Sequence, residues 1–104
     1  LLTTIDVSNN LLLYHLECSS AGLNPNTFTT LDVSVNVNLV WLNCLGGGLQ
    51  HLYLGSVLDL VGLNLNVESN PNLTIHVGTP QRVTDFQNIF VAGTHYDVGT
   101  IITI

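Results

Sequence analysis

The chain has 104 residues, of which 46% are hydrophobic and only 8% are charged, and its formal net charge is −6. This length predicts one domain, and the charged fraction is about a third of the roughly 25% that is typical of soluble domains. Lysine is absent and Arg82 is the single fixed cation. Because the chain cannot neutralise a row of phosphates, the composition argues against a nucleic-acid partner and against docking on anionic lipid.

No stretch of the sequence predicts membrane insertion. The longest apolar-rich run, residues 52–65, is interrupted by Gly55, Asp59 and Asn64, and it is shorter than the roughly 20 apolar residues that a spanning helix needs. No signal peptide is visible, and Leu1 in place of methionine predicts a processed chain or a segment of a longer one. The low charge predicts either a surface of small polar residues or a surface that another chain covers.

The strongest signal is a repeated pattern of leucine, asparagine and cysteine. Residues 30–44 contain the half-repeats L-x-V-x-x-N and L-x-x-L-x-C, and Leu31 and Leu42 are eleven positions apart. The pattern also occurs upstream, in residues 5–18, and downstream, in residues 52–65 and 73–77. If residues 24–28 are an insertion, the spacing between repeats is 21 residues, which is typical of a repeat architecture. First strands are then predicted near Ile5, Leu31, Leu52 and Leu73, and second strands near Leu16, Leu42 and Leu63.

Alternation of apolar and polar residues predicts half-buried strands within each repeat. In the first repeat, a strand through Ile5 and Val7 is followed by a turn at Asn9-Asn10 and a second strand over residues 14–19. The repeat frame ends at Val77. Beyond it, residues 83–88 predict one helical turn, and residues 88–92, 95–98 and 100–104 predict short strands that close the array.

These motifs resemble bacterial leucine-rich repeats built from LDVSxNxxLxxLxCSxN units of 21 residues. The resemblance implies a mainly β fold, a leucine-rich-repeat solenoid with short parallel strands on two faces and a β-rich C-terminal closing segment. Its repeats cover residues 1–77, with the insertion at 24–28, and the closing segment covers residues 78–104. The residues that carry the resemblance are Ile5-Asp6-Val7-Ser8-Asn9-Asn10, Leu13, Leu16, Cys18-Ser19, Leu31-Asp32-Val33-Ser34, Asn36, Leu39, Leu42, Cys44 and Asn70-Pro71-Asn72-Leu73-Thr74.

The chain departs from this family at the asparagine positions. After the first strand of each repeat the position holds Asn10, Asn36 and then Val57. After the second strand it holds Ala21, Gly47 and Glu68. An internal asparagine ladder is therefore predicted to be incomplete.

Cys18 and Cys44 occupy the same position of successive repeats. A disulfide and a metal pair are both open, but two buried thiols that pack as small hydrophobic side chains are the favoured interpretation. No C-x-x-C motif is present to support zinc. Asp6 and Asp32 lack the D-x-D-x-D-G loop of a calcium site. No metal and no cofactor are therefore expected.

The sequence also gives little support for catalysis. The four histidines are His15, His51, His76 and His95, and none has an H-x-x-H or H-E-x-x-H partner. Ser8, His15 and Asp32 can be combined on paper into a Ser-His-Asp set, but no G-x-S-x-G motif supports it. We therefore expect a protein that is not an enzyme.

Two surfaces are candidates for binding. Alternation points His15, Trp41 and Gly62 outward from neighbouring second strands, and an outward tryptophan is typical of a contact surface. Alternatively, Trp41 packs under the insertion at residues 24–28. The second surface is the apolar end of the array, which residues 101–104 of another copy could cover to build a filament. The candidate interaction residues are His15, Trp41, Leu45, Tyr53, Ile101, Ile102 and Ile104.

Two functional hypotheses follow. The first is a non-catalytic extracellular or cell-surface repeat module that acts through protein–protein contacts, and whose sharper form assembles with copies of itself into a filament or surface layer. The second is an adhesion module that binds a glycan or a protein ligand on its strand faces. Both rest on the family resemblance, because a fold by itself does not fix a function.

Overall fold

The computed structural model describes residues 5–18, 29–46 and 48–104. This part of the chain is mainly β, with two parallel sheets and one helix, which confirms the predicted mainly β class. No helix within these residues combines the length and the apolar character needed to cross a membrane. The elements are β1 (His15–Glu17), β2 (Thr30–Asp32), β3 (Trp41–Asn43), β4 (His51–Tyr53), β5 (Asn64–Asn66), β6 (Thr74–His76), α1 (Pro80–Ile89) and β7 (Ile101–Thr103).

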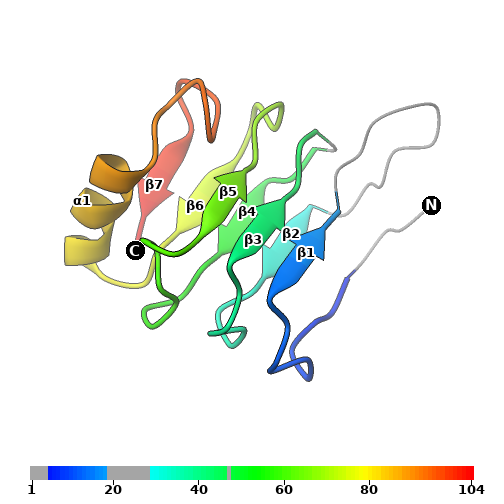
Figure 1. The fold of residues 1–104 in the computed structure, drawn as a ribbon. Helices are drawn as coiled ribbons and strands as arrows, with labels where there is room; N and C mark the ends of the chain where they lie inside the picture. Colours follow the sequence, from blue (N-terminus) through cyan, green and yellow to red (C-terminus); the bar gives the residue numbers. More distant parts are fainter. Residues whose placement is uncertain (1–4, 19–28, 47) are drawn as a thin grey trace.

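The chain alternates between the two sheets from β1 to β6. The three-stranded sheet has the order β1-β3-β5, and the four-stranded sheet has the order β2-β4-β6-β7. Parallel neighbours need a long crossover. Up to β6 each crossover contains a strand of the other sheet, whereas the crossover from β6 to β7 contains α1. The two sheets therefore lie one behind the other, and α1 lies at the end of the molecule away from β1 (Figure 1).

The core lies between the two sheets and is built from the middle residues of the strands. Each strand has three residues, so its middle side chain points inward while the first and third point outward. Leu31, Leu52 and Ile75 stack in register in the four-stranded sheet, and all three are fully buried. In the three-stranded sheet, Leu42 pairs with Leu65. The outward side chains are therefore held at strand spacing on two separate faces.

The register corrects the predicted position of the third repeat. Leu42 pairs with Leu65 and Leu52 pairs with Ile75, each two residues beyond the predicted strand starts at Leu63 and Leu73. The reason is a longer connection. The connection between β4 and β5, residues 54–63, is two residues longer than the connection between β2 and β3, residues 33–40. Asn64, rather than the predicted Gly62, consequently stands beside Trp41.

The first repeat is less regular than its sequence predicts. Residues 5–7 form no strand, and within residues 14–18 the strand predicted over 14–19 is limited to β1, while Ser19 lies outside the described residues. Val7 is nevertheless buried, and its carbonyl oxygen accepts a hydrogen bond from Asn36 Nδ2. The predicted insertion at residues 24–28 lies outside the described residues.

Two fully buried asparagines join successive connections. Asn36 Nδ2 donates to the carbonyl oxygens of Val7 at 3.0 Å and Asn10 at 2.9 Å. Asn70 Nδ2 donates to the Cys44 carbonyl oxygen at 2.9 Å, and Asn70 Oδ1 accepts from the Leu49 N–H at 2.9 Å. Because buried backbone groups need partners, these two amides hold neighbouring connections together.

The predicted asparagine positions are wrong in the later repeats. After β5 the buried position holds Asn70, not Glu68. In the third repeat the counterpart of Asn36 is Leu60. The Leu39 N–H donates to the Asn36 carbonyl oxygen, and in the same way the Leu63 N–H donates to the Leu60 carbonyl oxygen. The predicted Val57 is instead 68% exposed. The two-residue lengthening of this connection accounts for the shift from Glu68 to Asn70, whereas Leu60 lies three residues beyond Val57.

The C-terminal segment is more helical than predicted. Helix α1 spans ten residues rather than one turn, and Thr79 caps it by accepting the Arg82 N–H at 3.3 Å. Proline at the first helical position suits this start, because its missing N–H is not needed there. Phe86 and Phe90 lie four residues apart, a helical spacing, and their rings pack at an angle of 45° with centroids 4.6 Å apart. The predicted strand at residues 88–92 is therefore wrong.

One of the three predicted closing strands is present. Residues 95–98 contribute only an isolated bridge between Ala92 and Tyr96, so the strand predicted there is also wrong. Ile101–Thr103 forms β7 and pairs with β6. The closing segment is thus a helix followed by an edge strand.

Arg82, the single fixed cation of the chain, joins α1 to residues 54–63, the connection between β4 and β5. Its Nε donates to the carbonyl oxygens of Val77 at 2.8 Å and Gly55 at 3.1 Å, and its Nη2 donates to that of Leu58 at 2.9 Å. A guanidinium can satisfy several acceptors at once. The charge of Arg82 is therefore used to bind backbone carbonyls.

Cys18 and Cys44 form a disulfide, which corrects the favoured interpretation of two thiols. Each cysteine directly follows a strand, and Glu17 and Asn43 before them are register partners. Their Cα atoms are 4.9 Å apart, within the roughly 4.4–6.8 Å that a disulfide requires. In-register parallel strands bring equivalent positions to this separation, so the repeat itself creates the pairing.

We predict that the protein, purified without reductant, shows no titratable thiol after denaturation and two after reduction. Cys18→Ser should lower the free energy of unfolding by about 2–4 kcal/mol, because the cross-link restricts the unfolded chain. Thiol titration and denaturant unfolding check both points. Two free thiols in protein made in an oxidising compartment would contradict the disulfide.

We also predict that Asn36→Ala destabilises the fold by about 1–3 kcal/mol, since it removes two hydrogen bonds of a buried amide and leaves the Val7 and Asn10 carbonyl oxygens with their backbone donors alone. Asn38→Ala is the matched control, because the Asn38 amide makes an exposed hydrogen bond to the Leu11 carbonyl oxygen. The control should change stability by less than about 0.5 kcal/mol. Equal losses in urea unfolding would show that burial of Asn36 is not what matters.

Candidate functional site

The outer face of the three-stranded sheet carries two rows of aligned side chains. The first residues of β1, β3 and β5 align in one row, and the third residues align in the other. The first row consists of two aromatic rings, His15 and Trp41, followed by the amide of Asn64. The second row consists of the carboxylate of Glu17 followed by the amides of Asn43 and Asn66.

His15 and Trp41 stack face to face on this sheet. Their ring centroids are 5.2 Å apart and their planes differ by 8°, an arrangement in which the rings support each other. Trp41 keeps 39% of its surface exposed. The alternative that Trp41 packs under residues 24–28 depends on a segment outside the described residues.

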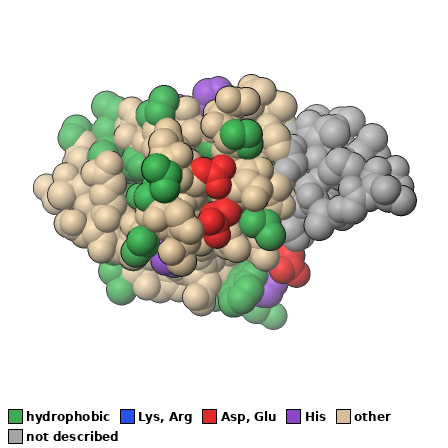
Figure 2. All heavy atoms as spheres, turned by 90° about the horizontal axis from the view of Figure 1, so that it is seen from above, with side chains coloured by type: hydrophobic (Ala, Val, Ile, Leu, Met, Phe, Trp, Pro, Cys, Tyr) green, Lys and Arg blue, Asp and Glu red, His purple; other side chains and the backbone are tan. Residues whose placement is uncertain are grey.

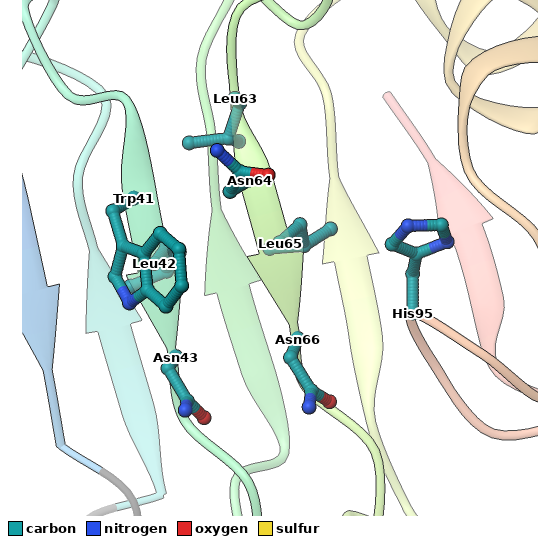
Figure 3. Close-up of a pocket in the computed structure, with 8 residues that line it drawn as sticks. All are labelled: Trp41, Leu42, Asn43, Leu63, Asn64, Leu65, Asn66 and His95. Atoms are coloured by element: carbon teal, nitrogen blue, oxygen red, sulfur yellow. The ribbon is translucent and has the colours of Figure 1, made fainter.

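A shallow hollow of about 210 Å³ lies beside Trp41. Trp41 stands on one side of it and His95 on the other, with Asn64 and Asn66 between them (Figure 3). The hollow follows from side-chain size, because a tryptophan on β3 is followed by a much smaller asparagine on β5. Its remaining lining residues are Leu42, Asn43, Leu63 and Leu65.

Hydrogen bonds orient the amides around the hollow. Asn43 Oδ1 accepts the Leu45 N–H at 3.1 Å, and Asn66 Oδ1 accepts the Glu68 N–H at 3.2 Å. These bonds leave the Nδ2 groups facing outward, and Asn43 Nδ2 donates to Glu17 Oε1 at 3.2 Å. The Asn64 amide has no hydrogen-bond partner among the described residues. It can therefore offer two donor hydrogens and an acceptor oxygen to a ligand.

His95 reaches the hollow from the C-terminal segment. Its Nδ1 accepts the Val91 N–H at 3.0 Å, so in the neutral ring the proton lies on Nε2, which can donate outward. The His95 ring also packs edge-on against Phe90 with centroids 5.3 Å apart. The sequence places His95 outward but gives no signal that it belongs beside Trp41, since the two residues are far apart in the chain.

The sequence-predicted interaction residues fall into three places. His15 and Trp41 meet on the three-stranded sheet, and Leu45 follows β3 with 36% of its surface exposed. Tyr53 lies on the four-stranded sheet, where its ring stacks on His76. The remaining three lie at the edge strand: Ile101, 60% exposed, Ile102, partly buried against the core, and Ile104, 59% exposed.

The Ser-His-Asp set composed on paper is not assembled. His15 lies in β1 of the three-stranded sheet, whereas Asp32 lies in β2 of the four-stranded sheet. The Asp32 carboxylate accepts instead from the Ser34 hydroxyl at 2.6 Å. Hydrogen bonds from the Ser8 hydroxyl and the Ser8 N–H lower the pKa of Asp6 below its ordinary value. These exposed carboxylates serve local turns.

The described residues also contain no group of three or more His, Cys, Asp or Glu side chains placed to hold a metal ion. Comparisons with protein-family models, with curated proteins and with solved structures found no match. The fold and the surface thus define a mainly β protein with two parallel sheets, one of which carries an aromatic and amide-lined hollow.

Proposed function

We propose that this protein is a non-catalytic, extracellular leucine-rich-repeat module that binds a glycan on the outer face of its three-stranded sheet. The repeat architecture is supported by strands that alternate between two parallel sheets around stacked leucines. The buried asparagines that join successive connections add to this support. A solenoid of this kind presents its strand faces as binding surfaces.

The hollow beside Trp41 is the observation that carries the glycan proposal. A sugar ring has an apolar face of C–H groups and a rim of hydroxyls, so it can pack on an indole while neighbouring amides bind its oxygens. Trp41 supplies the flat apolar surface, and Asn64 and Asn66 supply donors on one side of it. The volume of about 210 Å³ is below the roughly 300–1,000 Å³ of a pocket for a drug-sized ligand. It suits one ring of a longer glycan.

Charge supports a neutral glycan over an acidic one. The chain carries a formal charge of −6, and the lining of the hollow contains amides, apolar groups and one imidazole. The view from above shows the same scarcity of charge, with a surface mainly of uncharged side chains and a few acidic ones (Figure 2). An anionic sugar would meet a repulsive field on approach.

The disulfide supports an extracellular or cell-surface location. Cys18 and Cys44 are the only cysteines of the chain, and they are joined. Disulfides persist in oxidising compartments and are rare in the cytosol. The location and the proposed ligand agree, since glycans are displayed mainly outside cells.

We predict that Trp41→Ala weakens binding to a neutral glycan roughly tenfold, because the loss of a ring contact removes apolar area together with the stacking contribution. Binding is first located on a panel of neutral and acidic glycans and then measured by calorimetry. Tyr53→Ala is the matched control, as Tyr53 is also a stacked strand aromatic but lies on the other sheet. Equal losses in the two variants, or binding to no glycan on the panel, would overturn the proposal.

Self-assembly is the second candidate function, and exposed apolar side chains favour it. They lie before β1 and along the connections that lead from the four-stranded to the three-stranded sheet, and β7 is an outer strand with Ile101 exposed. Exposed apolar groups and open strand edges favour association. These exposed apolar residues are Leu11 and Leu12 before β1, and Val35, Val37, Val40, Val57 and Val61 in the connections, with exposures from 46% to 84%.

If self-assembly is the function, concentrated protein should form ordered fibres in negative-stain micrographs and fast-sedimenting species in the centrifuge. Ile101→Lys should abolish them, because a charge on an edge strand opposes strand pairing. Val98→Lys is the control, since Val98 is 81% exposed and lies outside the strand. Monomers at all concentrations would exclude this candidate.

A further inference from the structure

Two histidines meet on the outer face of the four-stranded sheet. His51 lies in β4 and His76 in β6, on neighbouring parallel strands. The register pairs Tyr53 with His76, so the two histidines stand diagonally across the strands. His51 Nδ1 and His76 Nε2 are 3.1 Å apart, although the residues are 25 positions apart in the sequence.

This nitrogen–nitrogen distance is that of a hydrogen bond between the two rings, and it also lies within the range for two ligands of one metal ion. With Zn–N bonds of about 2.0–2.1 Å, two nitrogens at tetrahedral or right-angle positions lie roughly 2.8–3.4 Å apart. We propose that His51 and His76 bind a divalent late transition-metal ion such as Zn²⁺ or Cu²⁺. This site lies on the opposite sheet from the hollow beside Trp41 and does not depend on the proposed glycan function.

The surroundings hold the two rings in place. The Tyr53 ring stacks on His76 with centroids 4.3 Å apart and planes within 10°. The His51 and His76 rings lie 5.3 Å apart at 31°. Stacking restricts the rotation of His76, so less side-chain freedom is lost when an ion binds.

The register neighbours of the two histidines carry no charge that would repel a cation. The register neighbours of His51 and His76 on the adjoining strands are the uncharged residues Thr30, Thr74, Tyr53 and Thr103. Arg82, the single Lys or Arg residue of the chain, donates to backbone carbonyls elsewhere. The formal net charge of −6 attracts a dication.

In the metal-free pair, one proton lies between the facing nitrogens, since one ring must donate to the other. Binding of the ion requires this proton to move to the second nitrogen of the same ring, which leaves both imidazoles neutral and both lone pairs free. The protein then supplies two ligands and water completes the coordination. Such an open site binds an exchangeable ion, unlike a closed structural site with four protein ligands.

The test is a calorimetric titration of the whole chain with Zn²⁺ and with Cu²⁺ at neutral pH. We expect one ion per chain, and tighter binding of Cu²⁺ than of Zn²⁺, as imidazole sites generally show. His51→Ala and His76→Ala should each weaken binding at least about tenfold, the scale on which even indirect partners change metal affinity. Electron paramagnetic resonance of the Cu²⁺ form should show coupling to nitrogen that each variant reduces.

His15→Ala is the matched control, because it removes an exposed strand imidazole from the other sheet. It should leave the affinity for both ions unchanged. Circular dichroism of each variant verifies that the fold is kept, and His51→Gln retains a polar side chain should His51→Ala not fold. Unchanged affinity in the His51 variant, or an equal loss in His15→Ala, would overturn the site. The His51 variant should still bind the glycan, because the two sites lie on different sheets. Loss of the metal site can therefore be distinguished from loss of the proposed glycan site.

Discussion

The in-register stacking of the middle strand residues is the constraint on which the rest of the structure depends. Leu31, Leu52 and Ile75 are fully buried and pair directly across three parallel strands. Since each strand has only three residues, fixing its middle side chain inward also fixes the other two outward. Equivalent positions then stack at strand spacing on each face. The disulfide, the His15–Trp41 stack and the Tyr53–His76 stack are all consequences of this one alignment.

The connections between the strands determine which side chains become neighbours. Asn36 and Asn70 hold successive connections together by donating to buried carbonyl oxygens. The connection at residues 54–63 is longer by two residues, and this shift sets Asn64 beside Trp41. The hollow forms because the small Asn64 amide lies next to the large Trp41 indole. The segment after α1 supplies His95 on its other side. A small change in connection length therefore creates the candidate site.

The two outer faces carry different chemistry and can act separately. The three-stranded sheet presents a tryptophan with amides, which suits a hydroxyl-rich ligand, whereas the four-stranded sheet presents two facing imidazoles. The core lies between the sheets, so a ligand on one face makes no direct contact with a ligand on the other. This arrangement would let a small chain hold the two proposed sites independently, without either one disturbing the packing that stabilises both.

The sequence by itself determined the mainly β class and the repeat that produces it, because alternation around Leu31, Leu42 and Leu52 leaves little choice of inward side chain. It also placed His15 and Trp41 on one outer face. It did not determine the register of β5 and β6, because a two-residue lengthening is invisible until the leucines are paired. Helix α1 was underestimated, since short apolar segments suit strand or helix until their packing is known. Only the tertiary structure brought His95 to Trp41 and His51 to His76, because contacts between residues so distant in the chain depend on the register of the whole sheet.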